Sequence, residues 1–326
     1  MYSSVFSNEI NLFMEQRKAS FSTYTIKGDC SVLTEFDRYL FSNNWNERYL
    51  SEGIVNGWIS SLSGKKTTIQ FKVGVIQVFF KFLNSLGIKT YMPPTPIAGD
   101  NYVPHIFTMD EVAAIFNAAD NIEYNHQNPC QNIQAEFPMV LRILYGCGLR
   151  IGETLLLKVS DVDFDNGVLI IKNAKGKKQR IVPMDRYLCS LLELYCSHMG
   201  LISKPDSFLF PYKTESDHLP IATVYGIFFR LLKRLGIQPD DRKWHERGPC
   251  LHSFRHTFTV EAFRKAKQAG RDINDSVPFL STYLGHNSLR ETDKYLKFSA
   301  EMFNDDIHQF SDFTKNIYRE VPHEKE

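Results

Sequence analysis

A proline-rich stretch early in the chain divides it into two parts. Residues 91–100 include Pro93, Pro94 and Pro96 and few apolar side chains. Proline fixes φ and has no backbone N–H, so such a run is typical of a linker and unsuited to a helix or strand. We therefore expect one domain over 1–91, a linker over 92–104 and a second domain over 105–326. The chain has 326 residues, of which 43% are hydrophobic, so it can fill a core in each domain.

The first part is predicted to be helical. Apolar residues recur at helical spacing in four segments, 6–18, 25–42, 52–62 and 67–86. The side of the last segment that is predicted to face the core carries Phe71, Val75, Val78, Phe79, Phe82, Leu83 and Leu86. Lys65 and Lys66 precede this segment, where they and the first helical amides can meet a phosphate. A solvated loop is nearly as well supported there.

The second part combines helices with one β-hairpin. Thr108 and Glu111 form a capping-box pattern before the apolar residue Val112, so a helix is expected to open this domain. A polar stretch over 121–134 is predicted to be a loop. Helices are expected near 136–150, 186–199, 221–235, 253–269, 276–284 and 289–297, and the hairpin over 168–183. The predicted fold class is mainly α with a small β-sheet (α+β).

The turn of the hairpin is strongly basic. Five positive residues fall within nine positions without an acidic one: Lys172, Lys175, Lys177, Lys178 and Arg180. Such a tract is usually a solvated face or a nonspecific contact with phosphates, and we expect that role for all of them except Lys175. Lys175 lies at the edge of the turn, where it can protonate a leaving oxygen as a general acid.

Two arginines occur in contexts that suit anion binding. Arg150 follows two glycines that interrupt an apolar helical run, and it lies at a helix start. His252 and Arg255 are three residues apart, so on a helix they share a face. Two guanidinium groups around a phosphate can neutralise the charge that grows on its oxygens in a transition state. For either arginine alone, a surface salt bridge is the better interpretation. His256 is expected to point elsewhere and to be structural.

A histidine and a tyrosine are separated by a predicted helix break. His286 and Tyr295 are nine positions apart, which on one straight helix would place them on opposite faces. Gly285 is typical of a helix C-terminus, and Ser288 with Glu291 matches a capping box that opens a new helix. This break allows both side chains to share a site with the arginines, where a phenolate can attack a phosphodiester. The alternative for Tyr295 is an aromatic side chain in a core or groove.

The ordered set of motifs resembles the tyrosine recombinases of the phage-integrase family. That family has an arginine in a Gly-Leu-Arg-Ile-x-Glu context, a hairpin lysine, His-x-x-Arg, Leu-Gly-His and a tyrosine nine residues after that histidine. The matching positions are Arg150, Lys175, His252, Arg255, His286 and Tyr295, with Glu153 at the acidic position that supports the first arginine. The resemblance implies site-specific cleavage and rejoining of DNA through a 3′-phosphotyrosyl intermediate, with no metal, ATP or other cofactor.

The resemblance also implies an organisation. The first domain would be a helical core-binding (SAM-like) DNA-binding domain and the second the catalytic domain, with a C-terminal tail that packs on a neighbour. Four protomers would assemble on two duplex recombination sites, for a mobile element and with a possible accessory excision factor. Two alternatives remain open at this point: a type IB topoisomerase that relaxes one duplex, and a catalytically silent DNA-binding protein.

Composition adds little to this interpretation. The net charge of +1 is low for a DNA-binding protein, although the positive residues are clustered and the last 26 positions are acid-rich. The six cysteines form no Cys-x-x-Cys pair and are predicted to be reduced. No signal peptide or long apolar span is evident, so we expect a cytoplasmic, nucleoid-associated protein of a prokaryote.

Overall fold

The computed structural model describes residues 2–97, 104–122, 132–172, 179–238, 248–286, 288–289 and 292. Contacts between residues divide the chain into an N-terminal unit, Met1–Tyr102, and a C-terminal unit, Val103–Glu326. The predicted fold class, mainly α with a small sheet, is confirmed. None of the helices in the described segments combines the length and the apolar character needed to cross a membrane.

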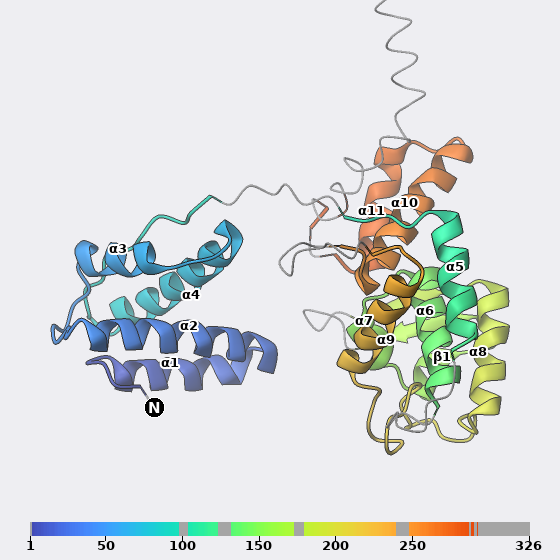
Figure 1. Ribbon diagram of the computed structural model, residues 1–326, viewed down its shortest axis with the longest axis horizontal. Helices are drawn as coiled ribbons and strands as arrows, with labels where there is room; N and C mark the ends of the chain where they lie inside the picture. Colours follow the sequence, from blue (N-terminus) through green and yellow to red (C-terminus); the bar gives the residue numbers. More distant parts are fainter. Residues whose placement is uncertain are drawn as a thin grey trace, which may run out of the picture. The chain divides into compact units, whose positions relative to one another are not determined.

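The N-terminal unit consists of helices around one apolar core (Figure 1). They are α1 (Ser7–Ser20), α2 (Thr23–Ser42), α3 (Glu52–Ser61) and α4 (Lys66–Ser85), within two residues of the predicted bounds. Aromatic rings fill the centre: Phe36 lies edge-on to Trp58 with ring centroids 5.1 Å apart, and it also contacts Phe80. Both α1 and α2 pack against α4.

The predicted inner face of α4 is partly wrong. Phe71, Val78 and Leu86 are exposed, whereas Val73, Ile76 and Phe80 are completely buried. The helix carries apolar residues around most of its circumference, so periodicity alone does not determine which stripe faces α1 and α2. Packing against α1 and α2 buries a face of α4 that is rotated about the helix axis from the predicted face.

The first half of the predicted linker is attached to the N-terminal unit. The backbone around Tyr91 pairs with Leu50, with the Tyr91 N–H donating to the Leu50 carbonyl at 2.8 Å. The Gln77 amide then donates to the Pro93 carbonyl and to the Thr95 hydroxyl, both at 2.9 Å. A side chain of α4 thus supplies hydrogen bonds to a backbone that proline keeps out of regular structure.

The C-terminal unit has more helices and the sheet. Its helices are α5 (Met109–Asp120), α6 (Ile133–Cys147), α7 (Ile151–Leu155), α8 (Arg186–His198), α9 (Ile221–Arg234), α10 (Leu251–Gln268) and α11 (Ile273–Leu284). The predicted capping box of Thr108 and Glu111 is present at the start of α5. A short 3-10 helix, η1 (Val159–Asp161), leads into the sheet. Most of the helix predicted over 289–297 lies outside the described residues.

The sheet contains the predicted hairpin and one further strand. Strands β1 (Val162–Asp163), β2 (Val168–Ile171) and β3 (Arg180–Pro183) are antiparallel in the order β1-β2-β3. Ile171 pairs with Arg180, so these two residues close the described part of the hairpin. The two-residue strand β1 is too short for an alternating pattern, and the sequence did not predict it.

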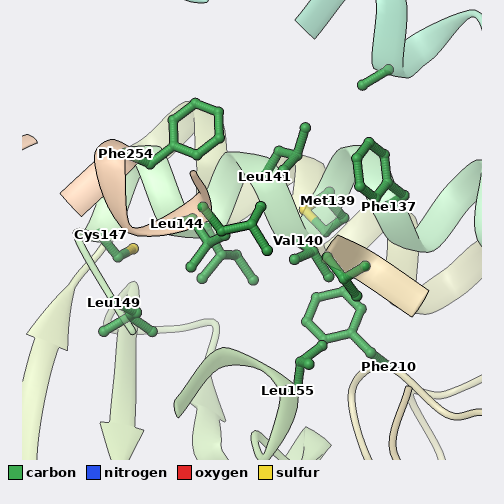
Figure 2. Packing of buried hydrophobic residues seen from close by; sticks show 14 of the residues in the cluster. Phe137, Met139, Val140, Leu141, Leu144, Cys147, Leu149, Leu155, Phe210 and Phe254 are labelled. Carbon is green, nitrogen blue, oxygen red and sulfur yellow. The ribbon is translucent and has the colours of Figure 1, made fainter. Parts of the chain in front are cut away.

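Helix α6 forms the centre of the C-terminal unit. Helices α5, α8 and α10 pack against it, and its side chains from Phe137 to Leu141 are buried without interruption. Figure 2 shows Leu141 and Leu144 of α6 beside Phe254 of α10, with Leu149 below the end of the helix. Because α6 is held on several sides, its C-terminus is a rigid point from which the following residues emerge.

Candidate active site

The chain turns sharply where α6 ends, and this turn presents Arg150. Gly148 has a φ of +60°. A Cβ atom there would lie 2.5 Å from the Phe258 side chain, so both the backbone conformation and the space require glycine. Arg150 follows as the N-cap residue of α7, and its side chain is 25% exposed. The guanidinium group is therefore partly enclosed and partly open.

Glu153 joins two arginines beneath this turn. Its Oε1 accepts from Arg150 Nη1 at 3.0 Å and from Arg180 Nη1 at 3.1 Å. Its Oε2 accepts from the Arg150 backbone N–H at 3.1 Å and from Arg180 Nη2 at 2.8 Å. Burial would raise the pKa of Glu153, but the hydrogen bonds and positive charges of Arg180 and Arg150 outweigh it and lower the pKa. Glu153 is a buried carboxylate.

Arg180 does not lie on the surface as the basic tract predicted. Its side chain is 9% exposed, and its Nε donates to the Tyr283 carbonyl at 2.8 Å. With both Nη atoms on Glu153, this arginine joins β3 to α7 and α11. A charge count along the sequence does not reveal such a partner, because Glu153 is 27 positions away.

Arg255 lies beneath the site and ties two helix ends together. Its side chain is buried, with 1% exposure. Nη1 donates to the carbonyl of Gly148 at 2.9 Å, and Nη2 donates to the carbonyl of Leu284 at 2.7 Å. These carbonyls belong to the C-terminal ends of α6 and α11, where helices leave acceptors without internal partners. One guanidinium group thus holds the segments that lead to Arg150 and to His286.

The end of α11 positions His286. The predicted helix stop at Gly285 is confirmed, with a φ of +67°. A Cβ atom on Gly285 would lie 3.0 Å from Arg180 Nη1, so the small residue allows the arginine to pack against the turn. His286 follows, and its Nδ1 lies 2.7 Å from the hydroxyl of the buried Thr292. This hydrogen bond fixes the plane of the imidazole ring.

His252 and Arg255 occupy the first turns of α10, as their spacing predicted. The His252 side chain reaches solvent, whereas His256 is partly buried. The two imidazole rings meet edge to face, with centroids 4.6 Å apart and planes at 87°. The prediction that His256 points elsewhere is wrong, because residues four apart on a helix lie one above the other.

The three histidines share an environment that disfavours the protonated ring. Desolvation, with the charges of Arg255 and Arg150, lowers the pKa of His252 to about 4, although Glu153 opposes this shift. Desolvation and the same two arginines lower the pKa of His286 to about 3. The pKa of His256 falls to about 3, through desolvation and then His252 and Arg255. All three rings are therefore neutral at pH 7, beside positive charge that suits an anion.

Several predicted site residues lie outside the described residues: Lys175, Lys177, Lys178, Glu291 and Tyr295. Chain geometry still limits two of them. Tyr295 is three residues after Thr292, and Lys175 is three residues after Lys172. Three residues of extended chain span at most roughly 11 Å. Each backbone position therefore stays within that distance of a described residue.

The remaining lysines differ in their surroundings. Lys172 is about half exposed and forms an ion pair with Asp161 at 2.5 Å, so a carboxylate competes with any phosphate there. Lys65 and Lys66 are exposed at the start of α4, and the side chain of the N-cap residue Lys65 makes no capping hydrogen bond. Among the described residues, no group of three or more His, Cys, Asp or Glu side chains is arranged to bind a metal ion.

Sequence reasoning missed three contributors to the site. His256 could have been recognised from its spacing of four to His252. Thr292 precedes Tyr295 by three positions, which on a helix places both on one face. Arg180 carried no local signal, since its partners Glu153 and Tyr283 lie in distant segments.

The sequence is similar to those of known proteins over most of its length. The sequence profile of the phage integrase family matches residues 105–302. A protein of Pseudothermotoga lettingae described as a tyrosine recombinase is 26% identical over 283 residues, which cover 84% of this chain and 87% of the relative.

Two solved structures share the fold. The site-specific recombinase XerH, bound to a palindromic difH substrate in a post-cleavage complex, has a TM-score of 0.71 at 19% identity, over 90% of this chain and 82% of XerH. The Tn1549 transposon integrase, in complex with a circular intermediate DNA, has a TM-score of 0.60 at 17% identity, over 88% of this chain and 94% of the integrase.

Proposed function

The chain belongs to the phage integrase family and is a tyrosine recombinase that cleaves and rejoins DNA, and we propose that Tyr295 is its nucleophile. Tyr295 attacks a phosphodiester at its recombination site to give a 3′-phosphotyrosyl link and a free 5′-hydroxyl. The 5′-hydroxyl of a second strand then attacks this link, which releases the tyrosine and completes strand transfer. The number of phosphodiester-type bonds is conserved in each step.

One observation carries this proposal: the Arg255 guanidinium group ties together the segments that carry the other candidate residues. It donates to the Gly148 carbonyl, two residues before Arg150, and to the Leu284 carbonyl, two residues before His286. His252 precedes Arg255 by three positions on α10. Four of the six positions implied by the motifs therefore lie on three segments that meet at Arg255.

The roles follow from exposure and charge. Arg150, which is partly open, contacts the non-bridging oxygens of the scissile phosphate. Arg255 is buried with both Nη atoms on carbonyls, so in this state it acts through its charge and through the segments that it holds. Nearby positive charges stabilise the phenolate form of Tyr295. In a free tyrosine, whose pKa is about three units above pH 7, forming the phenolate at pH 7 costs roughly 4 kcal/mol.

A neutral histidine in the site can accept the proton of the nucleophile. His252 reaches solvent and is neutral, so it can accept the phenolic proton of Tyr295 as the Tyr295 O–P bond forms. His286 is oriented through Nδ1 by the Thr292 hydroxyl at 2.7 Å. Lys175 donates a proton to the departing 5′-oxygen. The backbone of Lys175 stays close to the base of the hairpin, because Lys172 is only three residues before it.

The other parts of the chain bind DNA and assemble the complex. The helical N-terminal unit serves as a core-binding domain, with Lys65 and Lys66 and the uncapped start of α4 against phosphates. Lys172, Lys177 and Lys178 contact phosphates near the cleavage site, and the C-terminal tail with Met302 and Phe303 packs on a neighbouring protomer. Four protomers form the synaptic complex.

The biological setting is proposed from the relatives. The transposon integrase supports a mobile element as the source of the recombination sites. We place the enzyme at the nucleoid in the cytoplasm of a prokaryote, with an accessory excision factor as a further partner. The sequence of the site is read by contacts and by DNA deformability, and must be found by experiment.

The test uses nicked duplexes cut from the DNA that flanks the gene. The wild type should form a denaturant-resistant adduct, and peptide mapping should locate the link at Tyr295. Tyr295→Phe should form no adduct and should bind the same duplex with unchanged affinity. An adduct on another residue, or cleavage by the phenylalanine variant, would contradict the assignment of the nucleophile. Strand exchange between two labelled duplexes distinguishes a recombinase from a topoisomerase that relaxes one duplex.

A further inference from the structure

Arg180 occupies a place in the site that no catalytic motif assigns to it. We propose that Arg180 is a positioning residue that neutralises Glu153 and thereby leaves the charge of Arg150 available to the scissile phosphate. This inference rests on the proposed function of Arg150 as the phosphate-binding arginine. It assigns to a residue of the basic hairpin a task other than contact with DNA.

The hydrogen-bond geometry around Glu153 supports this division of labour. Arg180 binds the carboxylate with both Nη atoms, one on each oxygen, which is the fork arrangement that neutralises a carboxylate best. Arg150 gives the carboxylate only one guanidinium contact, through Nη1, together with its backbone N–H. Among the described residues, Glu153 is the one hydrogen-bond partner found for the Arg150 guanidinium, and the group is partly exposed.

The net charge of the Arg150, Glu153 and Arg180 side chains depends on Arg180. Glu153 and Arg150 alone would form a neutral pair, and a neutral pair attracts a phosphate weakly. With Arg180 included, one carboxylate faces two guanidinium groups, and the cluster keeps one net positive charge. Because Arg180 is the more deeply buried of the two arginines, the surplus charge lies on the side of Arg150, which reaches solvent.

Arg180 is held in place by further contacts besides those with Glu153. Its Nε is bound to the Tyr283 carbonyl, and Gly285 leaves space for its guanidinium group. The same side chain therefore connects the strand after the basic turn with the segment that carries His286. Arg180→Gln would leave the buried Glu153 with Arg150 as its remaining cationic partner, and we expect Arg150 to rotate inward and form the fork itself.

The experiment compares two substrates that differ in the charge at the scissile phosphorus. Single-turnover cleavage is measured on a nicked duplex with a normal scissile phosphodiester and on one with a methylphosphonate there, which lacks the negative charge. Arg180→Gln should slow cleavage of the phosphodiester on the order of 10²-fold, as expected when a preorganised cation is lost. Cleavage of the methylphosphonate should slow much less, because its transition state carries one negative charge fewer and so depends less on a free guanidinium group.

A double variant and a matched control sharpen the test. Arg180→Gln with Glu153→Gln should regain most of the phosphodiester rate, because a neutral side chain no longer pairs with Arg150. The control is Arg142→Gln, which removes an equally bidentate arginine from Asp120 at the end of α5. This control should leave both rates unchanged. Arg180→Lys, which keeps the positive charge, should retain a larger share of the phosphodiester rate than Arg180→Gln, and it serves if the glutamine variant does not fold.

The outcomes separate this inference from the proposed function. Equal losses on both substrates, or no recovery in the double variant, would show that Arg180 only supports the packing, and would overturn the inference. A wild type that forms no adduct on either substrate would instead overturn the proposed function, and with it the role given to Arg180. A loss confined to the charged substrate, reversed by Glu153→Gln, supports the inference.

Discussion

Both units of the protein bury carboxylates, but they use them differently. In the N-terminal unit, Asp29 accepts two hydrogen bonds from Arg17, and Asp37 accepts from the backbone N–H groups of Ser3 and Ser4. Asp29 joins α2 to α1, and Asp37 joins α2 to the residues that precede α1. In the C-terminal unit, Glu153 joins the start of α7 to β3 through two arginines.

A buried charge can position a site as well as stabilise a fold. These contacts hold α2 against α1 and against the start of the chain, and their loss should lower the stability of the N-terminal unit. In the C-terminal unit, Arg255 connects α10 to the ends of α6 and α11, and Arg180 connects β3 to α11 and to Glu153 of α7. Their loss should disturb the chemistry as well as the fold. Four predictions test this contrast, in order of decreasing effect.

The largest effect is expected for Arg255→Lys. An ammonium group can reach one of the carbonyls of Gly148 and Leu284 but cannot bridge them as the guanidinium does. Losing a buried hydrogen bond to a charged group should lower the free energy of unfolding by about 2 kcal/mol. Adduct formation should slow on the order of 10²-fold at a temperature where the variant is folded. Denaturant unfolding and single-turnover cleavage measure the two effects, and full activity in a destabilised variant would contradict the dual role.

Asp29→Asn should show the opposite pattern. It removes the charge that pairs with Arg17 through two hydrogen bonds at 2.8 and 2.6 Å, in a place where the Asp29 side chain is 3% exposed. The free energy of unfolding should fall by about 1–3 kcal/mol. The rate of cleavage at saturating DNA should remain that of the wild type, because Asp29 and Arg17 belong to the N-terminal unit, whereas the candidate site is built from residues of the C-terminal unit. A slower chemical step at saturation would argue against the separation of the two units.

Acid should destabilise the C-terminal unit selectively. The pKa values of His252, His256 and His286 lie below the ordinary value of 6.5, so the unfolded chain binds protons first as the pH falls. The stability that they contribute is complete above pH 6.5 and is lost as the pH falls toward 3–4. Glu136 acts in the opposite sense, because desolvation raises its pKa to about 8. Residues 2–97 contain no histidine.

The expected result is a net loss of stability between pH 6.5 and 5 in the transition that reports on the C-terminal unit. A fully titrating group contributes at most about 1.4 kcal/mol per pH unit, and solvent screening at His252 reduces its share. Thermal unfolding followed at several pH values measures the slope. His256→Gln should make the slope shallower, and Glu136→Gln should make it steeper. An unchanged slope in both variants would refute the assignment.

The smallest effect is expected at the start of α4. Lys66→Ala should weaken DNA binding by a similar factor on all sequences and should reduce the salt dependence of binding by about one unit of slope. Lys72→Ala is the matched control on the same helix, because Lys72 is paired with Glu35 at 2.7 Å. Titrations of duplex at several salt concentrations provide the measurement. Equal slopes in the two variants would remove Lys66 from the DNA-binding surface.

Features that depend on neighbouring residues in the sequence were predicted correctly more often than features that depend on contacts between distant segments. The capping box of Thr108 and the stop at Gly285 are local signals, and the structure contains both. The exposed face of α4, the burial of Arg180 and the contact of His256 with His252 were predicted wrongly. The first two depend on partners from other elements, whereas the third was within reach of a spacing argument.

The burial of Arg255 illustrates the same limit within a recognised motif. Its spacing to His252 indicated a shared face, and both residues lie in the first turns of α10. Nothing in the local sequence indicates that its Nη atoms bind the carbonyls of Gly148 and Leu284. Those acceptors become available only when α6 and α11 end beside α10.

The residue types at ordered spacings were sufficient to identify the family, the mainly helical fold and the chemistry, because each motif is a short-range pattern with its own physical requirement. The distribution of charge among Arg150, Glu153 and Arg180 depended on folding. Their separation in sequence leaves the pairing open, since any arginine can neutralise any carboxylate. Packing of α6, α11 and β3 around one buried point determined which arginine is held inside and which one remains partly exposed.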